Sequence, residues 1–261
     1  MKEYPTPWRQ VLALTPHIWA KTRYSVKTFT EQSLPCLKPD PQIEGLENLP
    51  PSPAFVLAPN HYQRPGLWIL HPCSVITVAL QRHYDLPDPP IRWVVTANWP
   101  PVKIGPWRLP SPGDWLLPRV AHALHCYPVS FAGTNPALTA RSYRTLLKDA
   151  KSLDRPLGIF PEGVAGRAFQ MAPPLPGVER LFVTLAKLGL PVVPCGMHET
   201  DRLVVRFGSV ISPAELESAP HAADLIMARI RCLAPPRRPP HHISGFGDPT
   251  PMMRRIARNR P

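Results

Sequence analysis

Short apolar runs alternate with longer amphipathic segments along most of this chain. Each short run is bounded by proline, glycine or polar residues and is typical of a buried strand; the runs span residues 54–58, 91–96, 126–130, 157–160, 191–195 and 203–207. The longer segments have helical periodicity and cover residues 66–82, 113–125, 136–151, 177–188 and 213–231. Strands that alternate with helices need crossover connections. We therefore predict an α/β fold with a mostly parallel sheet flanked by helices on both faces.

The first segment with a helical pattern, residues 8–26, is basic and amphipathic. Its apolar and small residues share one helical face, made of Trp8, Val11, Leu12, Thr15, Ile18, Trp19, Thr22 and Val26. A helix that packs on the domain core and a helix that lies at a membrane interface have the same periodicity, so both interpretations stay open. The two tryptophans and Tyr24 favour the interface, where amphipathic aromatic side chains are enriched.

Three regions follow from this pattern. Residues 1–34 hold the N-terminal amphipathic helix, and residues 35–232 form a single α/β domain that begins with a proline-rich connector. A chain of 261 residues has room for one large domain with appendages. Residues 233–261 are rich in proline and arginine and have few apolar side chains to bury, so we expect a disordered basic tail.

The formal net charge of +12 at pH 7 draws the protein toward anionic partners, either membrane headgroups or nucleic acid. Five scattered cysteines, an odd number without a C-x-x-C pair, argue against a disulfide framework or a zinc site. The sequence contains no uninterrupted run of about 18 apolar residues and no signal-peptide pattern. We expect a cytoplasmic protein that binds no metal and lies peripherally on a membrane.

Two polar motifs directly follow predicted strands, where the sites of α/β proteins collect. The first is Asn60-His61 and the second is Pro161-Glu162-Gly163. A histidine at such an edge can act as a general base, and a Glu-Gly turn offers a carboxylate and backbone N–H groups to a polar substrate. Each motif alone also fits a structural role: a histidine whose hydrogen bonds are made within the fold, or a simple turn.

Four stretches, in their order along the chain, together resemble the glycerolipid acyltransferase family: Asn60-His61, LGIFPEG at 157–163, PVVPCGMHE at 191–199 and FGSVI at 207–211. The best-known members of this family are the 1-acylglycerol-3-phosphate acyltransferases, enzymes of phospholipid biosynthesis. The resemblance covers residues 50–212, and IFPEG is its most specific part.

The resemblance implies that His61 removes a proton from an acceptor hydroxyl, which then attacks the thioester of acyl-CoA or an acyl carrier protein. It also implies that Asn60 and the segment from Phe160 through Pro161 and Glu162 to Gly163 bind the acceptor, a lysophospholipid or a related molecule. The acyl thioester is a co-substrate, and no further cofactor is expected.

The chain departs from the family at the acid that orients the histidine. Five residues after His61, where the family has aspartate, stands Gly66. In serine proteases, loss of a comparable orienting acid costs on the order of 10⁴ in rate. A literal H-x-x-x-x-D occurs at His83–Asp88, but it follows a helix and we interpret it as coincidence. Candidates for a replacement acid are Glu162, Asp85 and Asp114.

The family's cationic phosphate anchors are also missing. The stretch at 127–131 reads YPVSF without the usual arginine, and the chain has EGVA at 162–165 where the family commonly has EGTR. Arg64 and Arg167 are the candidate substitutes, since guanidinium groups bind phosphate bidentately. Both also fit the interpretation of ordinary surface arginines.

These motifs and departures leave three hypotheses for the function of the protein. The first is a peripheral membrane acyltransferase that works with His61 as general base on an anionic membrane surface. The second is a catalytically impaired descendant that keeps the fold and binds lipid, which the missing aspartate and arginines favour. The third is nucleic-acid binding through the basic tail, which no recognised motif supports, so we expect no nucleic-acid partner. The oligomeric state stays open.

Overall fold

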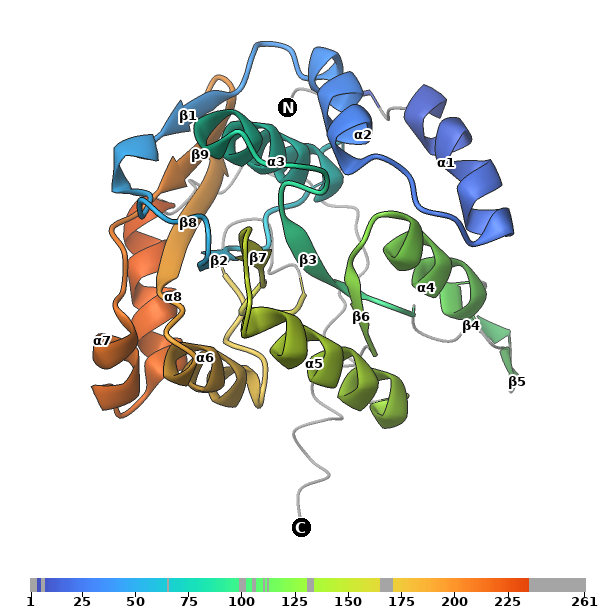
Figure 1. Cartoon of the computed structure of the whole chain (residues 1–261). Helices are drawn as coiled ribbons and strands as arrows, with labels where there is room; N and C mark the ends of the chain where they lie inside the picture. The colour runs from blue at the N-terminus through green and yellow to red at the C-terminus, as the bar shows by residue number, and fades with distance from the viewer. Residues whose placement is uncertain are drawn as a thin grey trace.

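The strands of the protein form one twisted sheet with helices on both sides, as the computed structural model shows (Figure 1). The structure describes residues 4–5, 8–64, 66–98, 102–104, 107–109, 111, 113–130, 134–164 and 171–234. Arg167 and all but the first two residues of the tail predicted at 233–261 lie outside these ranges.

Within the described ranges the sheet has seven strands in the order β1-β9-β8-β2-β7-β3-β6. Every neighbouring pair is parallel except β8 and β9, which are antiparallel. The predicted, mostly parallel sheet is therefore confirmed. The strand bounds are β1 Gln42–Glu44, β2 Val56–Pro59, β3 Arg92–Thr96, β6 Tyr127–Val129, β7 Leu157–Gly158, β8 Val192–Glu199 and β9 Leu203–Phe207. A separate hairpin pairs β4 (Val102–Ile104) with β5 (Trp107–Leu109).

Helix α3 (Leu70–Tyr84) lies on one face of the sheet, and a second set of helices lies on the other (Figure 1). This second set is α5 (Pro136–Ala150), α6 (Val178–Lys187), α7 (Pro213–Ser218) and α8 (Ala222–Leu233). Three more helices, α1 (Trp8–Ala20), α2 (Val26–Ser33) and α4 (Gly113–Ala123), share a smaller apolar cluster. The single turns of 3-10 helix are η1 (Leu34–Cys36) and η2 (Leu46–Asn48).

Successive side chains at the central strand β2 point alternately to the two faces of the sheet, and they form the centre of the core on each face. Phe55 and Leu57 pack on the side of α3, whereas Val56 and Ala58 pack on the side of α6 and α8. All four side chains are fully buried. A strand covered on both faces needs apolar residues at every position, which explains the continuous apolar run. Burial of each large side chain contributes about 1.5–3 kcal/mol.

Two long helices predicted from the sequence are each interrupted. The first ends at Ala20, and α2 begins after Ser25, whose side-chain oxygen accepts the backbone N–H of Thr28. The predicted helix at 213–231 splits into α7 and α8 because Pro220 forces Ala219 into an extended conformation. Strand β1, within the predicted connector, was missed because its three residues gain their structure only by pairing with β9.

Helix α1 buries only a small part of the apolar face predicted for it. Leu14 and Ile18 are buried against α2 and α4, whereas Trp8, Leu12 and Trp19 are 63%, 67% and 68% exposed. The sequence left open whether this face packs on the core or lies at a membrane interface, and in the structure most of the face lies outside the core because the helix packs through Leu14 and Ile18. Among the described residues, no helix is long and apolar enough to span a bilayer.

Candidate active site at the carboxyl edge of the sheet

The two polar motifs meet where neighbouring strands β2 and β7 end. The strands pair through Val56 with Leu157 and Leu57 with Gly158, so the residues that follow them emerge side by side. The backbone N–H of His61 donates to Oε1 of Glu162 at 2.6 Å. The predicted meeting of these two motifs at one edge of the sheet is thus confirmed.

The Asn60 side chain extends the hydrogen-bonding pattern of the sheet beyond the end of β2. Its amide nitrogen donates to the carbonyl of Met197 at 3.0 Å, and its side-chain oxygen accepts the N–H of Met197 at 2.6 Å. The residue is 5% exposed. Both ends of the amide bind the backbone of β8, so Asn60 fixes the direction in which the chain leaves β2 toward His61.

Glu162 connects three loops at this edge. Its second oxygen accepts the N–H of Ala172 at 2.5 Å, while the first binds the N–H of His61. Glu162 is only 2% exposed. Burial raises the pKa of Glu162 to about 7, and the two N–H donors oppose that rise. The carboxylate therefore holds the backbone of His61 rather than its imidazole ring.

The imidazole of His61 lies against an aromatic wall. Its ring centroid is 5.1 Å from that of Phe160, which in turn stacks on Trp93 at 5.3 Å and 18°. The close packing explains Gly158, because a Cβ there would lie 2.2 Å from a ring carbon of Trp93. Burial lowers the pKa of His61 to about 4, so the ring is neutral at physiological pH.

The Nδ1 atom of His61 is buried and has no hydrogen-bond partner within the described part of the chain. Gly66, five residues after His61, adopts a left-handed φ of 76° in a tight turn. Arg64 and Leu67 close this turn by exchanging backbone hydrogen bonds of 3.1 and 2.9 Å. The other candidate acids lie elsewhere: Asp85 caps the end of α3 and Asp114 lies in the first turn of α4.

Arg64 forms a buried ion pair with Glu199, the last residue of β8. Its Nε and Nη2 atoms donate to the two carboxylate oxygens at 2.6 and 2.5 Å, and the hydroxyl of Tyr62 donates to the same carboxylate at 3.0 Å. The side chain of Arg64 is 3% exposed. Sequence reasoning overlooked Glu199, although its place at a strand end was a usable signal. To bind phosphate, Arg64 would have to give up this carboxylate.

The Phe160–Gly163 segment forms a tight turn. The N–H of Gly163 donates to the carbonyl of Phe160 at 3.1 Å, and the N–H of Leu175 donates to the carbonyl of Pro161 at 2.8 Å. Gly163 has a φ of 64°, a backbone conformation that residues with a side chain rarely adopt. It is also exposed to solvent. Arg167, the other predicted phosphate anchor, lies outside the described residues.

The literal motif His83–Asp88 lies away from this site. Asp88 comes before β3, at the opposite edge of the sheet, and accepts the N–H groups of Val26 and Lys27 at the start of α2. His83 is exposed and packs edge-on against Tyr84. The structure describes no cluster of three or more His, Cys, Asp or Glu side chains that could hold a metal ion.

Comparison with known proteins identifies the fold. No protein-family model and no curated protein matches the chain. Among solved structures, the chain is similar to the 1-acyl-sn-glycerophosphate (LPA) acyltransferase PlsC from Thermotoga maritima, with a TM-score of 0.50 and 15% sequence identity. The match covers 79% of this chain and 75% of that one. At this identity the similarity shows that the two proteins share an α/β fold.

Proposed function

We propose that the protein transfers a fatty acyl group from an acyl thioester to a hydroxyl of a lysophospholipid or related acceptor. The observation that carries this proposal is His61, a neutral imidazole at the carboxyl edge of the sheet whose backbone is fixed by Glu162. The fold shared with an acyltransferase supports the same reaction class. The donor is acyl-CoA or an acyl carrier protein, and the chemistry needs no metal.

In the proposed reaction, His61 removes the proton from the acceptor hydroxyl as its oxygen attacks the thioester carbonyl. Because Nδ1 is the buried ring nitrogen, Nε2 is the atom that accepts this proton. The tetrahedral intermediate collapses with cleavage of the carbon–sulfur bond. The imidazolium then returns its proton to the leaving thiolate, so that an ester and a free thiol are released.

The residues around His61 have distinct parts in this proposal. Asn60 and Glu162 position the chain at His61 through backbone contacts, and Phe160 with Trp93 forms an apolar wall beside the base. The exposed turn at Gly163 is the part of the second motif that can contact an acceptor directly. We expect slow turnover, because none of the described residues places a carboxylate on Nδ1 of His61 to fix its tautomer.

The second candidate function is lipid binding without catalysis. The unpartnered Nδ1 of His61 and the turn at Gly66 favour it, since both mark the absence of the usual acid. The two functions are distinguished by incubating the protein with radiolabelled acyl-CoA and a panel of lysolipids and simple alcohols. Transfer that is lost in His61→Ala but kept in His83→Ala supports catalysis. Lipid binding without transfer supports the second function.

We further propose that the protein acts on an anionic membrane surface. The exposed side chains of Trp8, Leu12 and Trp19 on α1 continue onto α4, where Trp115 is 41% exposed and its ring lies 4.9 Å from Trp19. The guanidinium of Arg119 lies over the Trp115 ring at 4.4 Å. Aromatic side chains beside a cation suit the headgroup region.

Liposome sedimentation tests the membrane role. Binding should require anionic lipid, fall with salt and weaken in a Trp8→Ser/Trp19→Ser double variant. Equal retention on DNA would instead support the nucleic-acid hypothesis.

A further inference from the structure

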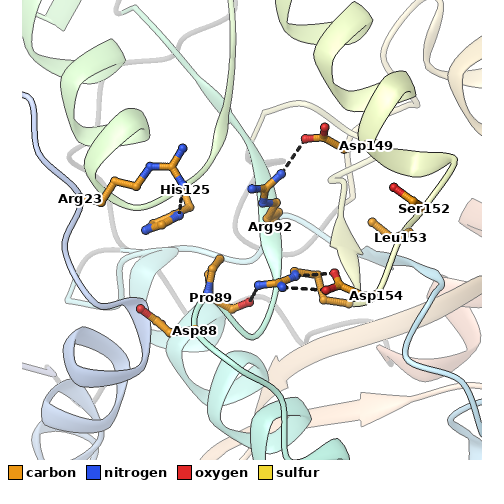
Figure 2. A pocket seen from close by; sticks show the side chains of 10 residues that line it. Arg23, Asp88, Pro89, Arg92, His125, Asp149, Ser152, Leu153 and Asp154 are labelled. Carbon is orange, nitrogen blue, oxygen red and sulfur yellow. Dashed lines mark hydrogen bonds and ion pairs between the residues drawn. The ribbon is translucent and has the colours of Figure 1, made fainter.

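A cavity of about 400 Å³ opens at the amino edge of the sheet, opposite the edge that carries His61 (Figure 2). Arg92 begins β3, His125 precedes β6, and Asp154 precedes β7, so the cavity gathers the loops that lead into three parallel strands. Its volume is in the range of ordinary small-molecule sites. The proposed acyl transfer uses none of these residues.

Each carboxylate at the cavity already has a partner. Asp149 accepts from Arg92 at 2.6 Å and from the hydroxyl of Tyr127 at 2.8 Å. Asp154 binds both Nε and Nη2 of Arg155, at 2.7 and 2.9 Å. The third carboxylate, Asp88, caps the N-terminus of α2, where the helix dipole is positive. Two of the three carboxylates thus form ion pairs with arginines, whereas Asp88 is bound by backbone N–H groups.

Arg23, the third guanidinium at the cavity, forms no ion pair with a carboxylate among the described residues. The guanidinium of Arg23 lies 3.0 Å from Nδ1 of His125 and makes this contact with a neutral ring rather than with a carboxylate (Figure 2). The Nε of Arg92 is buried without a hydrogen-bond partner in the described part of the chain. A buried donor that lacks an acceptor is costly, which favours an arriving anion.

We propose that this cavity is a second ligand site, which binds a small phosphate-bearing anion through the guanidinium groups of Arg23 and Arg92 and, once it is protonated, through the ring of His125. Guanidinium groups match the geometry of phosphate oxygens, and within the described part of the chain the exposed side chain of Arg23 contacts the ring of His125 rather than a carboxylate. The ligand is bound on the far side of the sheet from the proposed reaction, so it acts as an effector rather than as a substrate.

The site should respond to pH through His125. Burial lowers the pKa of His125, and the neighbouring cations Arg23 and Arg92 and the ring of His122 lower it further, whereas Asp88 raises it. A bound anion offsets the effect of these cations and favours the imidazolium. Anion affinity should therefore increase as the pH falls, and the pKa of His125 should rise when the site is occupied.

Isothermal titration calorimetry of the full chain with inorganic phosphate, at constant ionic strength, tests the site. We expect measurable binding that weakens about 10-fold or more in Arg23→Ala. Arg180→Ala removes the same charge from an exposed position on α6 and should leave the affinity unchanged. Ser152→Asp adds a carboxylate to the cavity lining at an exposed position and should abolish binding, whereas its neutral counterpart Ser152→Asn should not.

Three further measurements complete the test. Sulfate stays a dianion between pH 6 and 8, so tighter sulfate binding at the lower pH would report the protonation of His125. Methyl phosphate and vesicles with phosphatidic acid distinguish a soluble phosphate ester from a lipid headgroup. His61→Ala should bind phosphate normally, which separates this site from the proposed acyl transfer. Absence of phosphate binding, or equal losses in Arg23→Ala and Arg180→Ala, would overturn the proposal.

Discussion

The buried carboxyl group of Glu162 makes the protein less stable as the pH rises. Its pKa is about 7 in the folded protein against an ordinary value of 4.5, because the side chain is buried. The folded state thus holds a proton that the unfolded state releases. Stability contributed by protonated Glu162 is complete below pH 4.5 and is lost as the pH rises through 7, by about 3 kcal/mol in total.

Replacement of Glu162 by glutamine removes the titratable group and breaks one of its two hydrogen bonds. The glutamine oxygen can accept one of the two backbone N–H groups, from His61 or from Ala172, but its NH₂ group must face the other donor. An unsatisfied buried N–H costs about 1–3 kcal/mol. We expect Glu162→Gln to be less stable than wild type by that amount at pH 5, and about equally stable at pH 8.

Urea denaturation of both proteins between pH 5 and pH 8 measures the difference in free energy of unfolding. His61 titrates in both proteins, with stability lost as the pH falls from 6.5 toward its folded pKa of about 4, so its contribution cancels in the comparison. Glu217→Gln makes the same change at an exposed position in α7 and is the matched control, which should change the free energy of unfolding by less than about 0.5 kcal/mol. A loss of stability in Glu162→Gln that stays constant from pH 5 to pH 8 would show that the pKa of Glu162 is not raised in the folded protein.

Three more predictions concern the same edge of the sheet. Acyl transfer should keep its kcat/KM down to about pH 5, because the pKa of His61 is lowered to about 4; an acidic limb near 6.5 in the pH profile would contradict a buried base. Asn60→Ala removes both bonds to the Met197 backbone and should lower the free energy of unfolding by about 2–4 kcal/mol in urea titrations. Arg64→Met removes the cationic partner of the largely buried Glu199 and should cost about 3–5 kcal/mol, whereas the Arg64→Met/Glu199→Met double variant should recover most of the loss in thermal unfolding. Equal stability of the single and double variants would show that the pair is not the cause.

The sequence pattern was sufficient for six of the seven strands of the sheet, all but β1, and for the edge of the sheet at which the two polar motifs meet. Apolar runs such as residues 54–58 and 203–207 became strands because a strand buried on both faces leaves no room for polar side chains. The meeting of His61 with Glu162 also followed from sequence, since residues after parallel strands emerge at one edge. The break at Pro220 was missed by the prediction of one helix over residues 213–231, although proline restrains the residue before it and so gave a signal for the break.

Tertiary structure alone decided what each side chain contacts. Leu14 rather than Trp19 is buried in α1, because the partner surfaces come from α2 and α4, which lie later in the chain. Arg64 meets Glu199 across 135 residues of sequence, and no local pattern encodes that distance. The binding of Glu162 to the backbone of His61 depends on sub-ångström placement of two loops. Periodicity is a property of one segment, whereas a hydrogen bond or an ion pair requires two segments to be placed by the packing of the whole domain.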